Sequence, residues 1–352
     1  MNENPEFAVT NPSEFPFTEA RALVRDLMTP TPWIYWADFL FHILLAWGAV
    51  AVTLRVPAFS VGQIAAYLIA ALAFYRAVIF IHELAHLKKG TFRVFRVVWN
   101  LTCGIPLLTP SFTYDGVHND HHKRDVYGTG NDGEYVPFAL QPPFGMIVYV
   151  LLSLVLPLLV VARFLLLTPL SWVSPPVRRW VWARASSLTI DLNYVRSPKA
   201  IRNDHRWVLQ EFGAFVFAVV LLAGVALDIL GYQVLVLWYA IMALIFSINA
   251  LRTLAAHAYR NPPDHRLTVG EQFLDSVNVP GNLFLTALWA PVGLRYHATH
   301  HLFPKMPYHN LGKAHRRLVR DLSASAVYLQ TVRASLRDAL WRIWREAAIH
   351  QG

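Results

Sequence analysis

The stretch VGQIAAYLIAALAFYRAVIFIHELAH, residues 61–86, decides the fold class. Apart from Arg76, residues 61–81 carry no charge, and they are numerous enough to cross a hydrocarbon core of about 30 Å as a helix. The stretch ends in His82-Glu83-Leu84-Ala85-His86, whose two histidines share one side of a helix because they are four residues apart. The sequence therefore predicts a membrane helix that presents two imidazoles at its end.

The composition of the whole chain also indicates an integral membrane protein. Of the 352 residues, 55% are hydrophobic and 15% are charged, which is too apolar for an ordinary soluble domain. The formal net charge of +9 comes from loop arginines and lysines, which are typical of cytoplasmic loops near anionic lipid, so we expect no nucleic-acid binding. Cys103 is the only cysteine, which excludes an intramolecular disulfide and a cysteine-based metal site.

Five apolar segments have about the length of a membrane span. They are residues 36–54, 61–81, 144–167, 212–230 and 234–251.

An odd number of crossings conflicts with the charge pattern of the loops. The loops around residues 88–124, 178–206 and 316–320 are all basic, which places all of them in the cytoplasm. Segment 144–167 contains Pro157 and Arg163, so we expect it to be broken or re-entrant rather than to cross. The prediction is an all-α membrane protein with four transmembrane helices in two hairpins, which turn near residues 55–60 and 231–233, beneath a cytoplasmic helical cap.

The chain is predicted to have three parts. Residues 1–33 show no signal-peptide pattern and form a cytoplasmic tail, residues 34–317 form the catalytic domain, and residues 318–352 form an amphipathic helical region. In this last region Leu336, Leu340, Ile343 and Ala347 recur at helical spacing. This stripe fits a helix at the membrane interface and equally a surface helix packed on the cap.

Nine of the fifteen histidines fall into three boxes and one single site. In the two HxxHH boxes, the i, i+3, i+4 spacing is expected to present three rings on one helix face. Two metal ions with four or five imidazoles each match this number, and imidazole suits zinc, copper, iron and nickel. The predicted metal ligands are His82, His86, His118, His121, His122, His257, His297, His300 and His301.

Residues 82–86 also match the H-E-x-x-H pattern of zinc metalloproteases, in which Glu83 would be the general base. That alternative leaves most of the other histidines without a role. In the metal-cluster interpretation, Glu83 is an acceptor for an imidazole N–H, and further candidates for this supporting role are Asp115, Asp120, Asp125, Glu134, His205 and His309. We expect His42, His265 and His350 to be ordinary core or surface residues.

The three boxes together resemble those of the membrane fatty acid desaturase superfamily of non-haem diiron enzymes. The likeness runs from about residue 36 to residue 317, and it is sharpest in residues 118–122 and in residues 297–311, HATHHLFPKMPYHNL. The resemblance implies a four-span stem with a cytoplasmic diiron cap, and iron ligation by the nine histidines. It also implies O2 as co-substrate, a fatty acyl substrate, and electrons from a separate ferredoxin or cytochrome b5-type donor.

Within this superfamily we expect fatty acid desaturation. The sequence departs from the usual desaturase pattern in two places, which leaves the type of reaction open. These are Glu-Leu-Ala inside the first box and Thr253-Leu-Ala-Ala before His257. The alternatives are decarboxylation of free fatty acids to terminal alkenes, and hydroxylation of an alkyl chain or a sphingolipid. A decarboxylase must hold a buried carboxylate, which needs a cation. The candidates for that cation are Arg76 above all, then Arg252 and Arg295.

Overall fold

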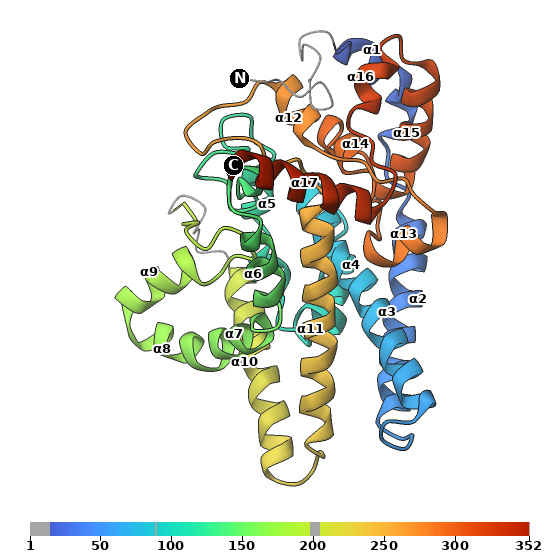
Figure 1. The fold of residues 1–352 in the computed structure, drawn as a ribbon. Helices are drawn as coiled ribbons and strands as arrows, with labels where there is room; N and C mark the ends of the chain where they lie inside the picture. The colour runs from blue at the N-terminus through green and yellow to red at the C-terminus, as the bar shows by residue number, and fades with distance from the viewer. Residues whose placement is uncertain (1–14, 89, 198–204, 352) are drawn as a thin grey trace. The chain divides into compact units, whose positions relative to one another are not determined.

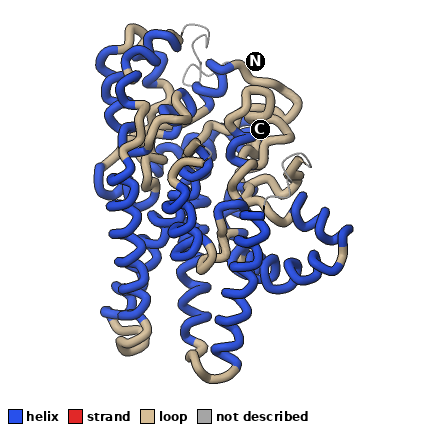
Figure 2. Tube along the Cα trace, turned by 180° about the vertical axis from the view of Figure 1, so that it is seen from behind, coloured by secondary structure: helices blue, strands red, loops and turns tan. Residues whose placement is uncertain are grey.

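The structure, a computed structural model, describes residues 15–88, 90–197 and 205–351 (Figure 1). Residues 1–14 of the predicted tail, and residues 89 and 198–204 of the predicted basic loops, lie outside the described residues. Along the part that is described, the chain forms helices and loops and no strand (Figure 2). The all-helical prediction is confirmed for these residues.

The long helices carry the apolar segments. They are α2 (Pro32–Thr53), α3 (Val61–His86), α10 (His205–Ala226) and α11 (Gln233–Leu254). The other α-helices are α1 (Phe17–Leu23), α4 (Arg93–Trp99), α5 (Val117–His121), α6 (Phe144–Leu152), α7 (Leu156–Ala162), α8 (Thr168–Val173), α9 (Pro175–Arg184), α12 (Val269–Asp275), α13 (Leu283–Trp289), α14 (His297–Leu302), α15 (Tyr308–Asp321), α16 (Ser325–Leu329) and α17 (Leu336–Gln351).

The chain divides into two compact units. Unit 1 comprises Met1–Thr31, His121–Met146 and Leu251–Gly352, and unit 2 comprises Pro32–Asp120 and Ile147–Ala250.

Among the described residues, five helical stretches are long and apolar enough to cross a membrane: Pro32–Thr53, Val61–His86, Leu156–Val173, His205–Ala226 and Gln233–Leu254. In Leu156–Val173, the π-helical turn Arg163–Leu167 joins α7 to α8. In unit 2, α2 and α3 form a packed hairpin. Ser60 caps α3 by accepting a hydrogen bond from the Gln63 backbone N–H, and the Gln63 side chain donates to the Thr53 carbonyl across the turn. Small buried residues such as Ala46, Ala70 and Ala73 let the helices approach closely.

The predicted segment 144–167 is broken, as Pro157 suggested. Helix α6 ends at Leu152, and α7 begins at Leu156 with Pro157 in its first turn, where proline is tolerated. The stretch long enough to cross is therefore shifted to Leu156–Val173. Within it Arg163 is buried and donates to the carboxylate of Glu211 at 2.6 Å, so a partner on α10 balances its charge. The number of helices that cross stays a prediction.

In unit 1, a short ladder of backbone hydrogen bonds joins three segments that are distant in sequence. The N–H of Val277 donates to the Ala256 carbonyl at 2.8 Å, and the N–H of Val279 donates to the Arg295 carbonyl at 2.7 Å. Between them, the buried Asn278 accepts from the N–H and the hydroxyl of Thr299. This ladder holds the segment of His257 against the beginning of α14, which carries the third box.

The predicted C-terminal helical region contains α15 in part, α16 and α17. Helix α17 buries Ala339, Ile343 and Ala347, and Ala339 packs with Ala255 and Val277 of unit 1. Trp341, on another side of the helix, stays 59% exposed. Two residues of the predicted stripe, Ile343 and Ala347, are buried, and Leu336 packs against the same cluster, so this side of α17 is the packing face.

Candidate metal centre

Four histidines of unit 1 form one compact group. The ligand atoms of His121, His257, His297 and His301 all lie within 4.8 Å of one another. The Nε2 atom of His297 is 2.9 Å from Nε2 of His257 and 3.1 Å from Nε2 of His301. The ring of His121 is 5.1 Å from that of His257 and 5.0 Å from that of His301. We call these residues the four-histidine group.

This arrangement fits a shared transition-metal ion. Metal–nitrogen bonds of about 2.0–2.1 Å place two imidazole nitrogens at right angles on one ion roughly 3 Å apart. Burial holds the pKa of His257, His297 and His301 well below the usual value, and neighbouring histidines lower each of them further. These rings are therefore neutral, which is the form that binds metals.

Two carboxylates support the outer sides of these rings. The Nδ1 atom of His121 is 2.8 Å from Oδ2 of the buried Asp132. Burial alone lowers the pKa of His121, but the carboxylate of Asp132 outweighs that effect, so the pKa is raised. The Nδ1 atom of His257 is 2.8 Å from the hydroxyl of Tyr127, which donates to Asp275 at 2.9 Å. Contacts of this kind fix the tautomer and leave Nε2 for a metal.

Asp132, Tyr127 and Asp275 were not predicted from the sequence. Asp132 is oriented by the backbone N–H groups of Gly128 and Glu134, which donate to its two oxygens at 2.8 and 2.9 Å. No spacing relative to a histidine box marks these residues in the sequence.

A second set of histidines lies in unit 2, at the end of α3 and on α5. The Nε2 atoms of His86 and His118 are 2.8 Å apart, and the ring of His82 is 4.4 Å from that of His118. The Nδ1 atom of His118 is 2.9 Å from the hydroxyl of Tyr114. We call His82, His86 and His118 the three-histidine group.

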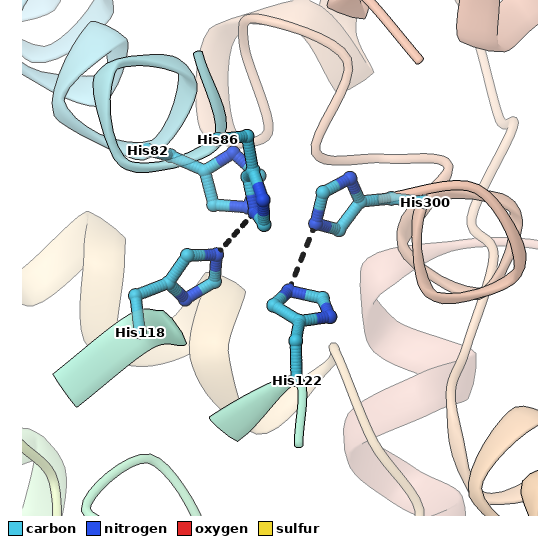
Figure 3. A group of neighbouring side chains, drawn as sticks. All are labelled: His82, His86, His118, His122 and His300. Atoms are coloured by element: carbon cyan, nitrogen blue, oxygen red, sulfur yellow. Dashed lines mark hydrogen bonds between the residues drawn. The ribbon is translucent and has the colours of Figure 1, made fainter. Parts of the chain in front are cut away.

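The remaining two predicted ligands, His122 and His300, both belong to unit 1. Their Nε2 atoms are 3.1 Å apart. Figure 3 shows His300 facing His122, and His86 facing His118.

The HxxHH boxes do not present three rings to one place, contrary to the expectation. In α14, His297 and His301 join the four-histidine group while His300 faces His122. Residues at i+3 and i+4 differ by about 100° in direction around a helix, so one box can supply ligands to two sites. In the second box, α5 ends at His121, and His122 lies beyond the helix.

The acidic residues predicted to support the rings have other contacts. Glu83 accepts a hydrogen bond from the Tyr35 hydroxyl at 2.6 Å, and its nearer oxygen is 3.8 Å from Nδ1 of His82. Asp120 accepts from the Tyr194 hydroxyl at 3.3 Å, and Asp115 accepts from the Asn119 side chain at 3.3 Å.

Of the remaining candidates for a supporting role, Asp125 and His205 are exposed and Glu134 is half-buried. His309 accepts from the N–H of Thr31 at 3.3 Å.

Two of the three arginines proposed for carboxylate binding have clear structural contacts. Arg76 makes a bidentate ion pair with Asp38: its Nε and Nη2 atoms donate to the two carboxylate oxygens at 2.7 and 2.6 Å. Arg295 donates to the backbone carbonyls of Pro280 and Leu283 at 3.5 and 3.3 Å. Arg252 lies in the last turn of α11, where its charge helps to lower the pKa of His257.

Comparison with known proteins agrees with this geometry. The fatty acid desaturase family model matches residues 58–333. A ceramide hydroxylase of Caulobacter vibrioides (strain NA1000 / CB15N) is 41% identical over 327 residues, covering 93% of this chain and 92% of that protein. No solved structure matches. The matched region contains all three boxes and His257, and the histidine groups fit a non-haem diiron centre. The chain belongs to the fatty acid desaturase family of membrane oxidoreductases.

Proposed function

We propose that this protein is an O2-dependent diiron hydroxylase of a membrane lipid with a ceramide-like structure. One observation carries the proposal: the similarity to a ceramide hydroxylase extends over nearly the full length of both chains. It favours the hydroxylase alternative over the desaturase that we expected from the sequence. In this reaction one oxygen atom of O2 enters a C–H bond of the lipid, and two electrons and two protons convert the other to water.

We propose that the nine histidines bind two iron ions, which supply the activation of O2. The four-histidine group of unit 1 binds one ion, and the three-histidine group of unit 2 supplies ligands to the second. The short Nε2–Nε2 distances and the burial of most of these rings support this assignment. Asp132 holds the Nδ1 proton of His121, and Tyr127 with Asp275 holds that of His257, so that both rings keep their orientation.

The contacts of Arg76 and Arg295 disfavour these two arginines as the binding site for the carboxylate of a free fatty acid. A substrate carboxylate at Arg76 would have to displace Asp38 from a bidentate ion pair. A substrate carboxylate at Arg295 would compete with two backbone carbonyls. A ceramide-like lipid carries no carboxylate, so it needs no such cation. This argument weighs against the decarboxylase alternative.

The topology remains part of the proposal. We propose four crossings, with both termini and every histidine box on the cytoplasmic side, because the loops that flank the histidine boxes are basic. Electrons then come from a separate cytoplasmic donor, since Cys103, the only cysteine of the chain, cannot hold an iron–sulfur cluster.

The test is product analysis with isotopic oxygen. The protein in membranes is supplied with a reductase system, labelled O2, and in parallel a ceramide, a free fatty acid and an acyl thioester. We expect mass spectrometry to find one labelled oxygen atom in the ceramide. An internal double bond would indicate a desaturase, and a terminal alkene one carbon shorter than the acid would indicate a decarboxylase; either product in place of the alcohol contradicts the proposal.

The hydroxylation assay also compares two matched histidine variants. His300→Ala removes a proposed ligand, and His350→Ala removes an exposed histidine outside the groups. We expect turnover to be lost only in His300→Ala.

A further inference from the structure

Residues 280–294 form a single loop that leaves the ladder of unit 1 between two of its segments. We call this loop the excursion. The excursion begins after Val279 and ends before Arg295, and these two residues are joined by the 2.7 Å backbone hydrogen bond. The guanidinium of Arg295 closes the base by donating to the carbonyls of Pro280 and Leu283. The excursion therefore has a fixed base, and α13 lies within it (Figure 1).

Helix α13 is well defined despite its seven residues. Asn282 caps it by accepting from the N–H groups of Phe284 and Leu285 at 2.9 and 3.1 Å. Gly281 and Gly293 flank the helix with φ of +48° and +75°, and a Cβ at Gly281 would lie 2.3 Å from Oγ1 of Thr286. Trp289 packs against the core cluster of unit 1. These contacts hold α13 in one orientation.

The outer face of α13 is apolar and exposed. Leu283 is 63% exposed, Phe284 79% and Leu285 66%, and Leu288 is also exposed. No charged residue occurs between Pro280 and Leu294.

The exposed face of α15, another surface helix of unit 1, differs from the apolar face of α13. The exposed positions of α15 are all charged, namely Lys313, Arg316, Arg320 and Asp321. A contiguous apolar surface of the α13 kind marks an interaction site in a soluble environment or contact with lipid.

We propose that the outer face of α13 inserts into the bilayer surface and contacts lipid chains. Unit 1 is tied covalently to helices that are apolar enough to cross: α2 begins directly after Thr31, and Leu251 lies within α11. A bilayer surface is therefore close to this unit along the chain. A tryptophan and an arginine at the base of an apolar helix are typical of the headgroup level.

Lipid explains the sequence of the excursion better than a protein partner does. The exposed face consists of leucine and phenylalanine with no polar group among them, whereas a protein interface has a polar rim and needs hydrogen-bond partners. The inference rests on the chain being a membrane protein and does not depend on the reaction proposed above.

The test uses spin labels on single cysteines. In a Cys103→Ala background, Phe284→Cys and Leu285→Cys are labelled with a nitroxide, the protein is placed in lipid vesicles, and relaxation by O2 and by a water-soluble nickel complex is compared. Lys313→Cys on α15 is the matched control, because it is exposed on the same unit. Because O2 concentrates in lipid, we expect both α13 labels to show a several-fold higher ratio of O2 to nickel accessibility than the control.

Two results would overturn the inference. A label on α13 as accessible to nickel as the label at Lys313 would place the helix in water. A label shielded from both reagents would show that protein covers it. Iron content and monodisperse elution of each labelled variant show that it is folded, and Leu288→Cys replaces a variant that fails this check. A negative hydroxylation assay would leave the spin-label result unaffected.

Discussion

The four-histidine group and the three-histidine group differ in what lies behind their rings. In unit 1, carboxylates stand behind two rings, with Asp132 against His121 and Asp275 behind His257 through Tyr127. In unit 2, the neutral hydroxyl of Tyr114 contacts His118 at 2.9 Å, and the Glu83 carboxylate lies 3.8 Å from Nδ1 of His82, beyond hydrogen-bond distance. A carboxylate raises the basicity of a ligating imidazole more than a neutral partner does. The two proposed iron sites are therefore expected to be chemically unequal.

The largest expected effect is the removal of a ring at the centre of the four-histidine group. His297 contacts both His257 and His301 through Nε2, so His297→Ala should abolish turnover and reduce bound iron from two ions toward one. Metal analysis and the hydroxylation assay measure both effects, with His350→Ala as the control. Full iron content in active His297→Ala protein would show that this group is not a metal site.

His315 is a buried histidine outside the boxes, and its ring contacts a tyrosine hydroxyl as that of His118 does. The Nδ1 atom of His315 is 2.8 Å from the Tyr328 hydroxyl, and burial, with Arg316 and Arg295 adding to it, lowers the pKa of His315 to about 4. Below the ordinary pKa of 6.5 the unfolded chain gains a proton that the folded protein does not accept until about pH 4. Acidification through this window should therefore reduce stability.

At about 1.36 kcal/mol for each pKa unit, His315 alone should cost the folded state about 3 kcal/mol by pH 4. His315→Gln should remove this part of the pH dependence, and thermal unfolding measured between pH 7 and pH 4 shows it. His350→Gln, at an exposed histidine, should leave the profile unchanged. If the unfolding temperature of His315→Gln fell with pH as steeply as that of the parent protein, His315 would not be held neutral.

Asp132→Asn tests the carboxylate side of the comparison. The amide keeps an acceptor for His121 but loses the charge, and the loss of such an outer partner typically costs about 10–100-fold in metal affinity or activity. The control is Asp264→Asn, an exposed carboxylate of the same unit outside the histidine groups. Iron retention during chelator titration, together with turnover, measures the difference. Equal behaviour of the two variants would contradict the role given to Asp132.

Much of this architecture follows from local sequence patterns. Apolar runs predicted the long helices, and Pro157 predicted the break between α6 and α7. The spacing of the boxes predicted which histidines gather, because it acts within one or two helical turns. The supporting role of Glu83 stays a prediction: one of its oxygens accepts from Tyr35 at 2.6 Å, and the other lies 3.8 Å from Nδ1 of His82.

The supporting residues could not be predicted because tertiary folding brings them to the rings. Asp132 reaches His121 through a turn that its own oxygens organise, and Asp275 reaches Tyr127 only because the ladder places residues 275–279 beside residues 256–258. The partner of Arg163 is likewise on another helix, at Glu211. Contacts between segments distant in sequence leave no periodic signal in a single chain.

The smallest effects are expected at Tyr127 and Tyr114, whose hydroxyls contact one histidine ring in each of the two groups. Tyr127→Phe removes the hydroxyl between His257 and Asp275, so it leaves a buried ring nitrogen and a buried carboxylate each with one partner fewer, at a cost of about 1–3 kcal/mol. Tyr114→Phe removes one neutral hydrogen bond from His118, at about 0.5–1.5 kcal/mol. Chelator titration and thermal unfolding of both variants measure the difference. Because the hydroxyl of Tyr127 links His257 to the carboxylate of Asp275, whereas that of Tyr114 contacts the His118 ring, Tyr127→Phe should lose iron more readily. Greater iron loss in Tyr114→Phe would reverse the inequality inferred between the two groups.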